Sequence, residues 1–479
     1  MKLKFCGASR TVTGSCYYLD TGSFKFIVDC GAFQGSDEVD ALNYEPFPFN
    51  PSEIDVVFLT HAHFDHCGRI PILVKQGFKG RIIGTQPTRD LSKIVLLDAA
   101  KLQQEEYERW QARSNMDGSR TNLSSEGSLY EQRKPLFSEE DVEEMFKLFE
   151  IYPYGSSINI SKDVEFRLRD AGHILGSAVV ELWVKTVEGR DRKLVFSGDL
   201  GQPGARIVRD PDLIREADYV ICEGTYGNRL HKSKDETVLE LLSILKQAKE
   251  EGSNVLIPSF AIERTQEILY EMNLFVENKL LDGLEVYLDS PMASKATEVF
   301  KQYPTFYDED ARRLLEKGDD PFHFPGLITV DSSEESKRLI SKKGVVIIAG
   351  SGMCTGGRIV HHIKNNIEKP NTHMIFVGYQ VEGTLGRKIV DREKEIRVMR
   401  ESLTVNAQIH TLGGFSAHGD QRDLRYWLRG FGHSPKKIFI VHADEEIAIG
   451  FGTNIKTELG YRTKSMINSI DSWIEKRKR

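Results

Sequence analysis

The hydrophobic pattern divides the chain into regions that predict two different arrangements of secondary structure. In the first 225 residues, short apolar runs such as SCYYLD, FKFIVDCG and EIDVVFLT are separated by tight turns, which predicts strands and hairpins. Beyond residue 226, apolar runs such as NVLIPSF, LEVYLDS and VVIIAG alternate with helical patterns. Alternation of strands and helices predicts a parallel sheet flanked by helices.

The alternation ends near residue 411, and a short β-rich segment follows. We therefore predict one α/β domain formed by residues 1–225 and 412–479, interrupted by an inserted α/β domain at residues 226–411. A length of 479 residues is enough for two or three hydrophobic cores. Within the first region, helical periodicity marks residues 89–111, and a polar loop is expected over residues 114–128.

Composition narrows the class of protein. The 64 basic and 71 acidic side chains give a net charge of −7, so no strong overall field attracts nucleic acid, although a local basic groove is compatible with this balance. The six cysteines form no C-x-x-C pair, which fits a reducing compartment. No apolar run is long enough for a signal peptide or a membrane span. We expect a soluble, cytoplasmic protein without a membrane partner.

A dense group of metal-ligand types follows one predicted strand. The segment LTHAHFDHCG contains His61, His63, Asp65 and His66 within six residues. Imidazoles and a carboxylate crowded in this way would be poorly satisfied without a cation. Asp65 and His66 diverge from the His61–His63 pair at a tight turn, so two adjacent metals would use the four ligands more easily than one.

Three further residues end apolar strands in similar settings. His173 lies between glycines in FRLRDAGHILGSA, Asp199 follows Gly198 in LVFSGDLG, and His442 ends the run KKIFIVHADEE. A single histidine or aspartate at a strand end is more often structural. Considered with the histidine cluster, His173 supplies a third imidazole for one metal, and Asp199 can bridge to a second.

The order of the motifs resembles a known family. In chain order the motifs are HAHFDH, GH before ILGSA, SGD, CEGTYGN, GSGMCTGGRIVHH, GYQVEGTLGR, GFSAHGD and VHADEE. The series of motifs is similar to the one found in the β-CASP branch of the metallo-β-lactamase superfamily. That branch includes ribonuclease J and the endonuclease that cleaves messenger-RNA precursors at their 3′ ends. The resemblance spans essentially the whole chain. It implies an αββα sandwich with a β-CASP domain inserted between the motifs of Glu223 and His418.

The resemblance also implies a set of metal ligands and a cofactor. In the family, one zinc ion is held by the residues matching His61, His63 and His173. The other is held by those matching Asp65, His66 and His442, and the residue matching Asp199 bridges the two. We therefore expect two Zn²⁺ ions per chain, with Mn²⁺ as an alternative metal.

The reaction implied is hydrolysis of RNA phosphodiester bonds in RNA processing or decay. Two zinc ions can hold a bridging hydroxide at neutral pH and offset charge on the phosphoryl oxygens. The expected catalytic residues are Asp65, Asp199, Glu223 and His418. His418, oriented by Glu223, would protonate the leaving 3′ oxygen, although SAHGD alone could be an ordinary helix cap. Endonuclease and 5′-exonuclease action are both compatible with the sequence.

Contacts with RNA phosphates are expected in the inserted region. The segment IIAGSGMCTGGR reads as a strand, a glycine-rich turn and a helix start, where backbone N–H groups and Ser351 could hold a phosphate. Arg264 and Arg358 are further candidates. A tight packing turn and surface ion pairs are the alternatives. The sequence leaves the oligomeric state open, a homodimer included.

Other functions within this fold are less consistent with the sequence. A thioesterase or lactonase would lack the insertion, a flavin-linked diiron oxidoreductase typically has glutamate at the place of His63, and a DNA-directed β-CASP nuclease tends to have valine at that of His442. A non-catalytic scaffold subunit would have lost ligands, whereas all seven are present. One departure is that the family's His-Gly-Glu is replaced by His442, Ala443 and Asp444. Because alanine resists positive φ and aspartate is shorter, we expect altered support for His442.

Overall fold

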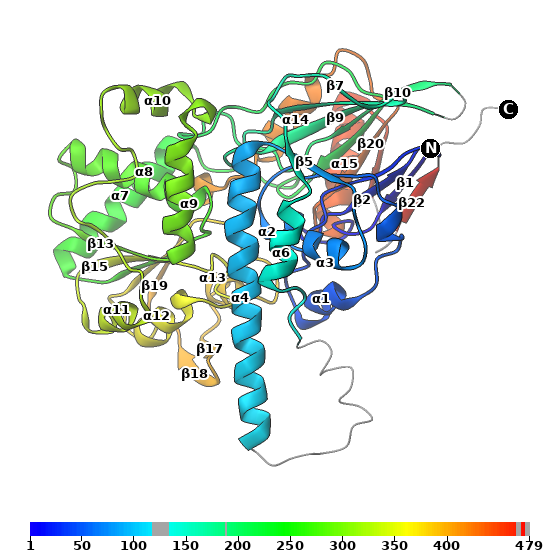
Figure 1. The fold of residues 1–479 in the computed structure, drawn as a ribbon. Helices are drawn as coiled ribbons and strands as arrows, with labels where there is room; N and C mark the ends of the chain where they lie inside the picture. The colour runs from blue at the N-terminus through cyan, green and yellow to red at the C-terminus, as the bar shows by residue number, and fades with distance from the viewer. Residues whose placement is uncertain (117–133, 187–188, 466–470, 475–479) are drawn as a thin grey trace.

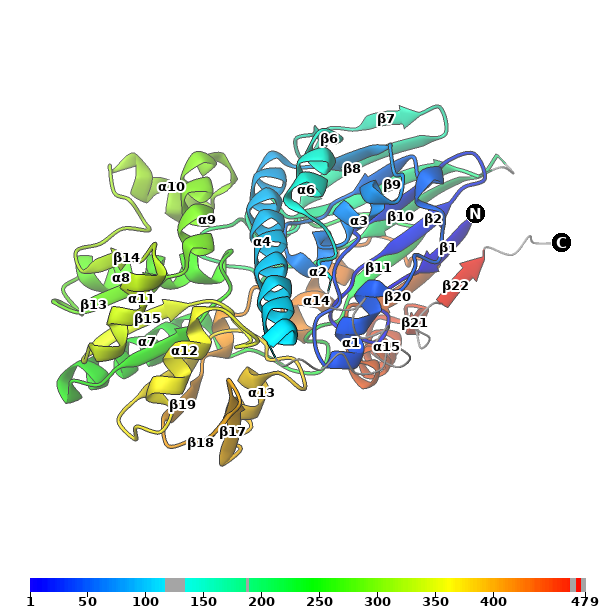
Figure 2. The same cartoon turned by 60° about the horizontal axis from the view of Figure 1, so that its bottom comes forward.

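The computed structural model describes residues 1–479 apart from 117–133, 187–188, 466–470 and 475–479. Two seven-stranded sheets form its larger part (Figures 1 and 2). The first has the order β22 (Asp471–Ile474), β1 (Lys2–Phe5), β2 (Tyr17–Asp20), β3 (Lys25–Val28), β4 (Val56–Phe58), β5 (Arg81–Gly84) and β6 (Phe149–Ile151). The second has the order β21 (Thr463–Ser465), β20 (Lys437–Val441), β11 (Tyr219–Glu223), β10 (Asp191–Phe196), β9 (Ala178–Lys185), β8 (Val164–Asp170) and β7 (Ile158–Ser161).

The two sheets pack face to face through a shared apolar core. Along β8, buried and partly buried residues alternate, because successive side chains of a strand point to opposite faces. Aromatic rings join the layers: the centroids of Phe58 and Phe166 lie 5.2 Å apart, and those of Phe5 and Phe439 lie 5.3 Å apart. The core therefore holds N-terminal and C-terminal strands of the chain together.

Helices cover the outer face of each sheet. The first is covered by α3 (Ile70–Lys75), α4 (Gln86–Met116) and α6 (Glu139–Phe146), and the second by α14 (Gln421–Arg429) and α15 (Glu445–Leu459). This is the predicted αββα sandwich. The expected helix at 89–111 lies within the longer α4, which has a proline in its first turn. Most of the loop expected at 114–128 lies outside the described residues.

A third, all-parallel sheet forms the other body of the molecule. Its order is β14 (Leu327–Thr329), β13 (Glu285–Asp289), β15 (Val345–Ala349), β12 (Val255–Pro258), β16 (His373–Phe376) and β19 (Gln408–Thr411). Helices α7 (Lys234–Glu251) and α8 (Arg264–Glu277) pack on one face, and α12 (Arg358–Asn366) and α13 (Leu385–Val390) pack on the other. The predicted parallel sheet flanked by helices is confirmed.

After the inserted sheet, the chain returns to the sandwich beside β11, the strand after which it left. Strand β11 ends at Glu223, and β20 pairs with it in parallel so that Glu223 lies opposite Val441. Smaller elements complete the described structure: α1 (Asp37–Ala41), α2 (Phe64–Cys67), α9 (Pro291–Gln302), α10 (Glu309–Glu316), α11 (Ser333–Arg338), β17 (Glu395–Val398) and β18 (Glu401–Thr404). None of the helices described here has the length and apolar character needed to cross a bilayer.

Candidate metal centre

The predicted ligands meet at one edge of the sandwich because each follows the end of a strand. His61 and His63 follow β4, His173 follows β8, Asp199 follows β10, and His442 follows β20. Strands β10, β11 and β20 run parallel, so their ends open on the same edge. Segments up to 381 residues apart in sequence (His61 to His442) thus supply side chains to one cluster.

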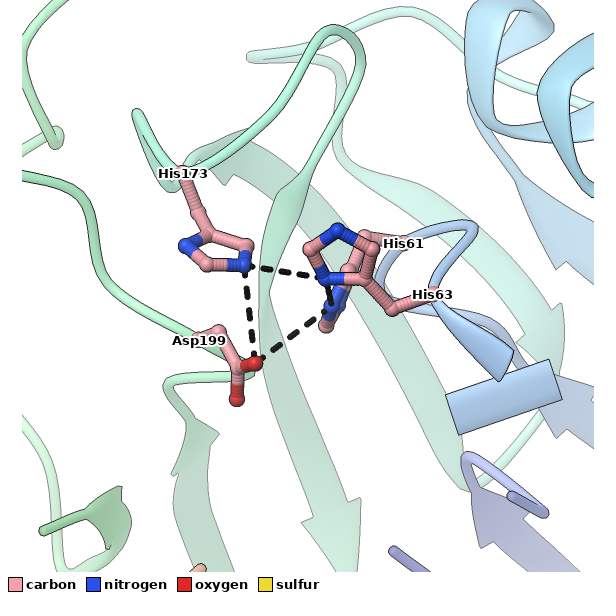
Figure 3. A group of neighbouring side chains, drawn as sticks. All are labelled: His61, His63, His173 and Asp199. Carbon is pink, nitrogen blue, oxygen red and sulfur yellow. Dashed lines mark hydrogen bonds and ion pairs between the residues drawn. The ribbon is translucent and has the colours of Figure 1, made fainter. Parts of the chain in front are cut away.

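A first group of ligand atoms surrounds one side of Asp199 (Figure 3). His63 Nδ1 lies 3.1 Å from His61 Nε2 and 3.2 Å from His173 Nε2. Asp199 Oδ2 lies 3.4 Å from His61 Nε2 and 3.6 Å from His173 Nε2. Three imidazole nitrogens and a carboxylate oxygen therefore converge on one point.

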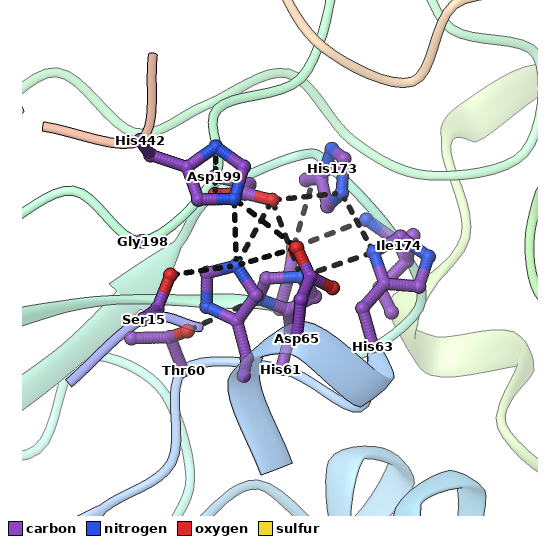
Figure 4. A network of polar contacts seen from close by, with 12 residues as sticks. Ser15, Thr60, His61, His63, Asp65, His173, Ile174, Gly198, Asp199 and His442 are labelled. Atoms are coloured by element: carbon purple, nitrogen blue, oxygen red, sulfur yellow. Dashed lines mark hydrogen bonds and ion pairs between the residues drawn. The ribbon is translucent and has the colours of Figure 1, made fainter. Parts of the chain in front are cut away.

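A second group, Asp65, His66 and His442, lies beside the same carboxylate (Figure 4). His442 Nε2 lies 3.2 Å from Asp65 Oδ2 and 3.3 Å from His66 Nε2. His66 Nε2 is also 3.3 Å from Asp199 Oδ2. The sequence-predicted set of seven residues is thus brought together as two adjacent groups with Asp199 between them.

The donor set fits bound metal ions. Ligand atoms of one tetrahedral zinc ion lie roughly 3.3–3.6 Å from one another, close to the separations in both groups. Asp199 is buried, and its Oδ1 has no hydrogen-bond partner, which is costly for a carboxylate unless a cation lies beside it. Nitrogen and carboxylate ligands of this kind suit zinc.

The protonation states of the first group suit metal binding. Burial lowers the pKa of His61 and His173 well below the ordinary value and lowers that of His63 to about 4, so all three imidazoles are neutral near pH 7. Burial opposes ionisation of Asp199, but the neighbouring histidines, led by His442, lower its pKa well below the usual range. Neutral imidazole and ionised carboxylate are the forms that bind a metal. In the second group, burial opposes protonation of His66, but the carboxylates of Asp199, Asp29 and Asp65 outweigh it and raise its pKa well above the ordinary value.

The other ring nitrogen of four histidines has a partner that orients the ring. His66 Nδ1 donates to Asp29 Oδ2 at 2.9 Å, and His173 Nδ1 donates to the carbonyl of Ala417 at 3.1 Å. Such contacts fix the tautomer and aim the remaining nitrogen. The remaining two partners are hydroxyls: Thr60 Oγ1 lies 3.0 Å from His61 Nδ1, and Thr225 Oγ1 lies 2.9 Å from His442 Nδ1.

Asp29 is a site residue that the sequence interpretation missed. It directly follows β3, is fully buried, and accepts from both the backbone N–H and the hydroxyl of Thr60 at 2.8 Å. The signal was present, because Asp29 ends the apolar run FKFIV just as Asp199 ends LVFSG. The threonine partners carried no comparable signal.

Ala443 does not adopt the positive φ that alanine resists. The positive φ, +52°, is at His442 itself, while Ala443 is fully buried without one. The backbone N–H of His442 donates to the carbonyl of Ala8 at 2.7 Å, which holds this conformation. Asp444 accepts from the hydroxyl of Tyr379 in the inserted body at 3.1 Å. Its carboxylate therefore forms a bridge between the two bodies.

His418 and Glu223 lie together beside Asp199. His418 Nδ1 is 3.1 Å and 3.2 Å from the two oxygens of the buried Glu223 carboxylate, and His418 Nε2 is 3.9 Å from Asp199 Oδ2. Burial opposes protonation of His418, but the carboxylates of Glu223 and Asp199 outweigh it and raise its pKa to about 9. The imidazolium form is therefore favoured at neutral pH.

A cavity of about 270 Å³ opens over the cluster and is lined by both bodies of the molecule. Arg264 and Ser351 lie in its wall, together with Phe260 and Tyr379. The Ser351 hydroxyl accepts from the backbone N–H groups at 355 and 356, so it stabilises its own turn. Arg264 forms an ion pair with Glu267.

Arg358 is not among the residues that line this cavity. Its guanidinium donates to Asp289 at 2.6 Å and to the carbonyls of Val330 and Asp331 at 2.9 Å. These donors stabilise the inserted sheet.

The sandwich of two sheets with a histidine and aspartate cluster at one edge defines the class: a metallo-β-lactamase fold with an inserted domain. Family models agree along the chain. Residues 10–146 match the metallo-β-lactamase superfamily, residues 265–389 match the Beta-Casp domain, and residues 402–466 match the Zn-dependent metallo-hydrolase RNA specificity domain.

Named relatives are similar over nearly the whole chain. Ribonuclease TTHA0252 of Thermus thermophilus is 38% identical over 94% of this chain and 95% of its own length. The transcription termination factor FttA of Methanosarcina mazei is 31% identical over 96% of this chain and 70% of its own length. A crystal structure of a protein of unknown function from Enterococcus faecalis, 12% identical, covers 98% of this chain and 99% of its own with a TM-score of 0.51, which supports the fold alone. The chain belongs to the β-CASP branch of the metallo-β-lactamase superfamily.

Proposed function

We propose that this protein is a zinc-dependent ribonuclease that hydrolyses RNA phosphodiester bonds with two metal ions. The observation that carries the proposal is the pair of adjacent ligand groups with Asp199 between them, beside a cavity that both bodies and Asp199 line. Similarity to a named ribonuclease and to an RNA specificity domain supports RNA as the substrate.

In this proposal, His61, His63 and His173 hold one zinc ion, and a second group holds the other. The second group consists of Asp65, His66 and His442. Asp199 belongs to the first group and lies 3.3 Å from His66 Nε2, so it would contribute to both metals. Bound there, zinc would acidify a water molecule and offset negative charge on the phosphoryl oxygens. Asp29, Thr60, Thr225 and the Ala417 carbonyl orient the ligand rings by their hydrogen bonds.

His418 is the proposed general acid. Its Nδ1 is held by the Glu223 carboxylate, which leaves Nε2 near Asp199 and the cavity. The elevated pKa means that His418 carries a proton at neutral pH. When the P–O bond to the 3′ oxygen breaks, that proton moves from Nε2 to the leaving oxygen. Glu223 keeps the ring oriented through its contacts with Nδ1.

For the RNA backbone we propose contacts with Arg264 and the turn of Ser351, both of which line the cavity. The guanidinium of Arg358 is held by Asp289 at the end of β13, so Arg358 is left out of these proposed contacts. We also propose the domain limits 1–225, 226–411 and 412–479. They are supported by the strand assignments, since β11 ends at Glu223 in one sheet and β19 ends at Thr411 in another.

The test is cleavage of three RNA substrates by the purified protein: linear RNA with a 5′-triphosphate, the same RNA with a 5′-monophosphate, and a circular form. We expect cleavage that a chelator abolishes and added Zn²⁺ restores, with DNA of the same sequence left uncut. Cleavage of the circle identifies endonuclease action, and cleavage that persists in chelator would contradict the proposal.

A further inference from the structure

Glu263, at the start of α8, has an unusual backbone conformation. Its φ and ψ are +66° and −57°, in a region that costs a non-glycine residue about 1–3 kcal/mol. The side chain is only 2% exposed. Backbone strain of this kind persists where interactions with the surroundings hold the residue in place. The contacts of the Glu263 side chain therefore indicate which interactions offset the cost of the strain.

The carboxylate of Glu263 reaches from the inserted body into the sandwich. Its Oε2 accepts from the backbone N–H of Leu175 at 3.0 Å, across 88 positions of sequence. Leu175 lies two residues beyond His173 in the same turn, AGHILGS. Glu263 therefore contacts the segment that carries one of the proposed zinc ligands.

Other contacts of this turn come from the sandwich and from the segment around residue 417. The N–H groups of His173 and Ile174 donate to Ser177 Oγ at 3.1 Å and 3.3 Å, and the His173 ring donates to Ala417 O. In this group of contacts, the hydrogen bond to Glu263 is the one that ties the turn to the inserted parallel sheet.

The start of α8 is itself firmly placed. Lys234 from α7 forms an ion pair with Glu267 at 2.6 Å and lies 4.8 Å from the centroid of the Phe415 ring. Arg264 forms an ion pair with the same Glu267. These ion pairs fix the helix start from which Glu263 extends, so a shift of the inserted domain would be transmitted to the His173 turn.

The second oxygen of Glu263 faces a small internal space. Oε1 is buried without a hydrogen-bond partner, and Glu263 lines a cavity of about 20 Å³ together with His173. That volume is enough for one water molecule. Burial raises the pKa of Glu263 well above its usual value. An uncharged, glutamine-like side chain is therefore compatible with this position.

We propose that Glu263 is a positioning residue that couples the inserted domain to the zinc ligand His173. This inference rests on the proposed function for the role of His173, but the contact that it names does not. The strained backbone places the carboxylate where it caps the Leu175 N–H, and the cap holds the turn so that His173 Nε2 faces His61 and His63.

Three variants separate the contact from the strain. Glu263→Gln keeps an acceptor for Leu175, Glu263→Ala keeps the strain without the acceptor, and Glu263→Gly removes both. We expect amide exchange of a peptide containing Leu175, measured by mass spectrometry, to be about tenfold faster in the Ala and Gly variants than in wild type or Gln. We expect Glu263→Gly to melt at or above the temperature of Glu263→Ala, because glycine relieves the strain.

Zinc affinity provides the second measurement. Loss of a group that supports a metal ligand weakens metal binding by about 10–100-fold, so Ala and Gly should each weaken one of the two zinc sites while Gln does not. Wild-type exchange at Leu175 in the folded Gly variant, or a Gln variant as impaired as Gly, would overturn the proposal. If wild type itself binds no zinc, the proposed function fails, and the exchange data still decide whether Glu263 holds the turn.

Discussion

Two buried aspartates end strands in the two bodies of the molecule, and both lie beside histidines. Asp199 follows β10 in the sandwich, and Asp289 ends β13 in the inserted sheet. Asp289 is fully satisfied: Arg358 donates to Oδ1, while Ser336 and His362 donate to Oδ2, each at 2.6 Å. Asp199 has four imidazole nitrogens within 4 Å of its Oδ2, and its Oδ1 has no hydrogen-bond partner.

The difference shows how a structural carboxylate can be told from a metal-binding one. Burial and neighbouring histidines are common to both residues, so neither property alone identifies a site. What distinguishes Asp199 is that its Oδ1 lacks a hydrogen-bond donor while the neighbouring histidines lower the pKa of the carboxyl group, because a buried charged oxygen is costly unless a cation lies beside it. Asp289 instead closes a network within the protein and needs no ligand.

The largest effect is expected from Asp199→Ala. Because Asp199 contributes to both ligand groups, its removal should release both metals and lower RNA cleavage by on the order of 10³-fold or more. Metal content by mass spectrometry and cleavage rate measure this. Glu216→Ala, which changes a side chain that is 69% exposed, is the control and should behave as wild type. An Asp199→Ala protein that retains metal and full activity would remove the two-metal account.

His418→Ala should separate chemistry from metal binding. His418 forms a third group of possible ligands with Asp199 and Glu223, but it belongs to neither of the two groups proposed to hold zinc. We expect turnover to fall by about 10²-fold or more while the zinc content stays unchanged. Glu223→Gln should lower turnover less, since it leaves the ring in place with a weaker partner. Loss of zinc from His418→Ala would reassign this residue to the metal centre.

Asp289→Ala tests whether Asp289 stabilises the fold and takes no part in zinc binding. The change leaves Arg358 and His362 buried without their carboxylate, which typically costs about 3–5 kcal/mol in the free energy of unfolding. Urea denaturation measures this loss, and zinc content should remain that of wild type. Glu285→Ala, on the same strand but half exposed, is the matched control. Zinc loss in a folded Asp289→Ala protein would contradict the distinction between a structural Asp289 and a metal-binding Asp199.

The smallest effect is expected from pH. Burial opposes ionisation of Asp289, but hydrogen bonds from His362, Ser336 and Arg358 outweigh it and lower its pKa below the ordinary value. A lowered carboxyl pKa stabilises the folded state above the unfolded pKa, near 4, and this stabilisation is lost as pH falls further. The urea midpoint of wild type should therefore drop more steeply below about pH 4 than that of Asp289→Asn. Parallel curves would show that this carboxylate contributes no pH dependence.

Much of the site could be predicted because its ligands share a local signal. His61, His173, Asp199 and His442 each follow an apolar strand, and strands that end on one edge bring such residues together. The same pattern predicted the alternating inserted sheet. Asp29 carries this signal too, yet a single aspartate after a strand is ordinary, and only its contact with His66 marks it as part of the site.

The residues that support the ligands could not be predicted, because their contacts join positions far apart in the sequence and follow no periodic pattern. Thr225 supports His442 across 217 positions, and Glu263 reaches Leu175 across 88. Neither the left-handed backbone of His442 nor that of Glu263 can be inferred from residue type, since both residues ordinarily avoid positive φ. The inward direction of Arg358 likewise follows from the position of Asp289 and not from the glycine-rich motif beside it.

If two metal ions act together at Asp199, RNA cleavage depends on both, and a zinc titration measures that dependence. Metal-free protein would receive Zn²⁺ in steps, with cleavage of a labelled RNA measured at each step. The account predicts little activity up to one equivalent per chain and a steep rise as the second equivalent binds. Full activity at one equivalent, or activity without added metal in the presence of chelator, would contradict it.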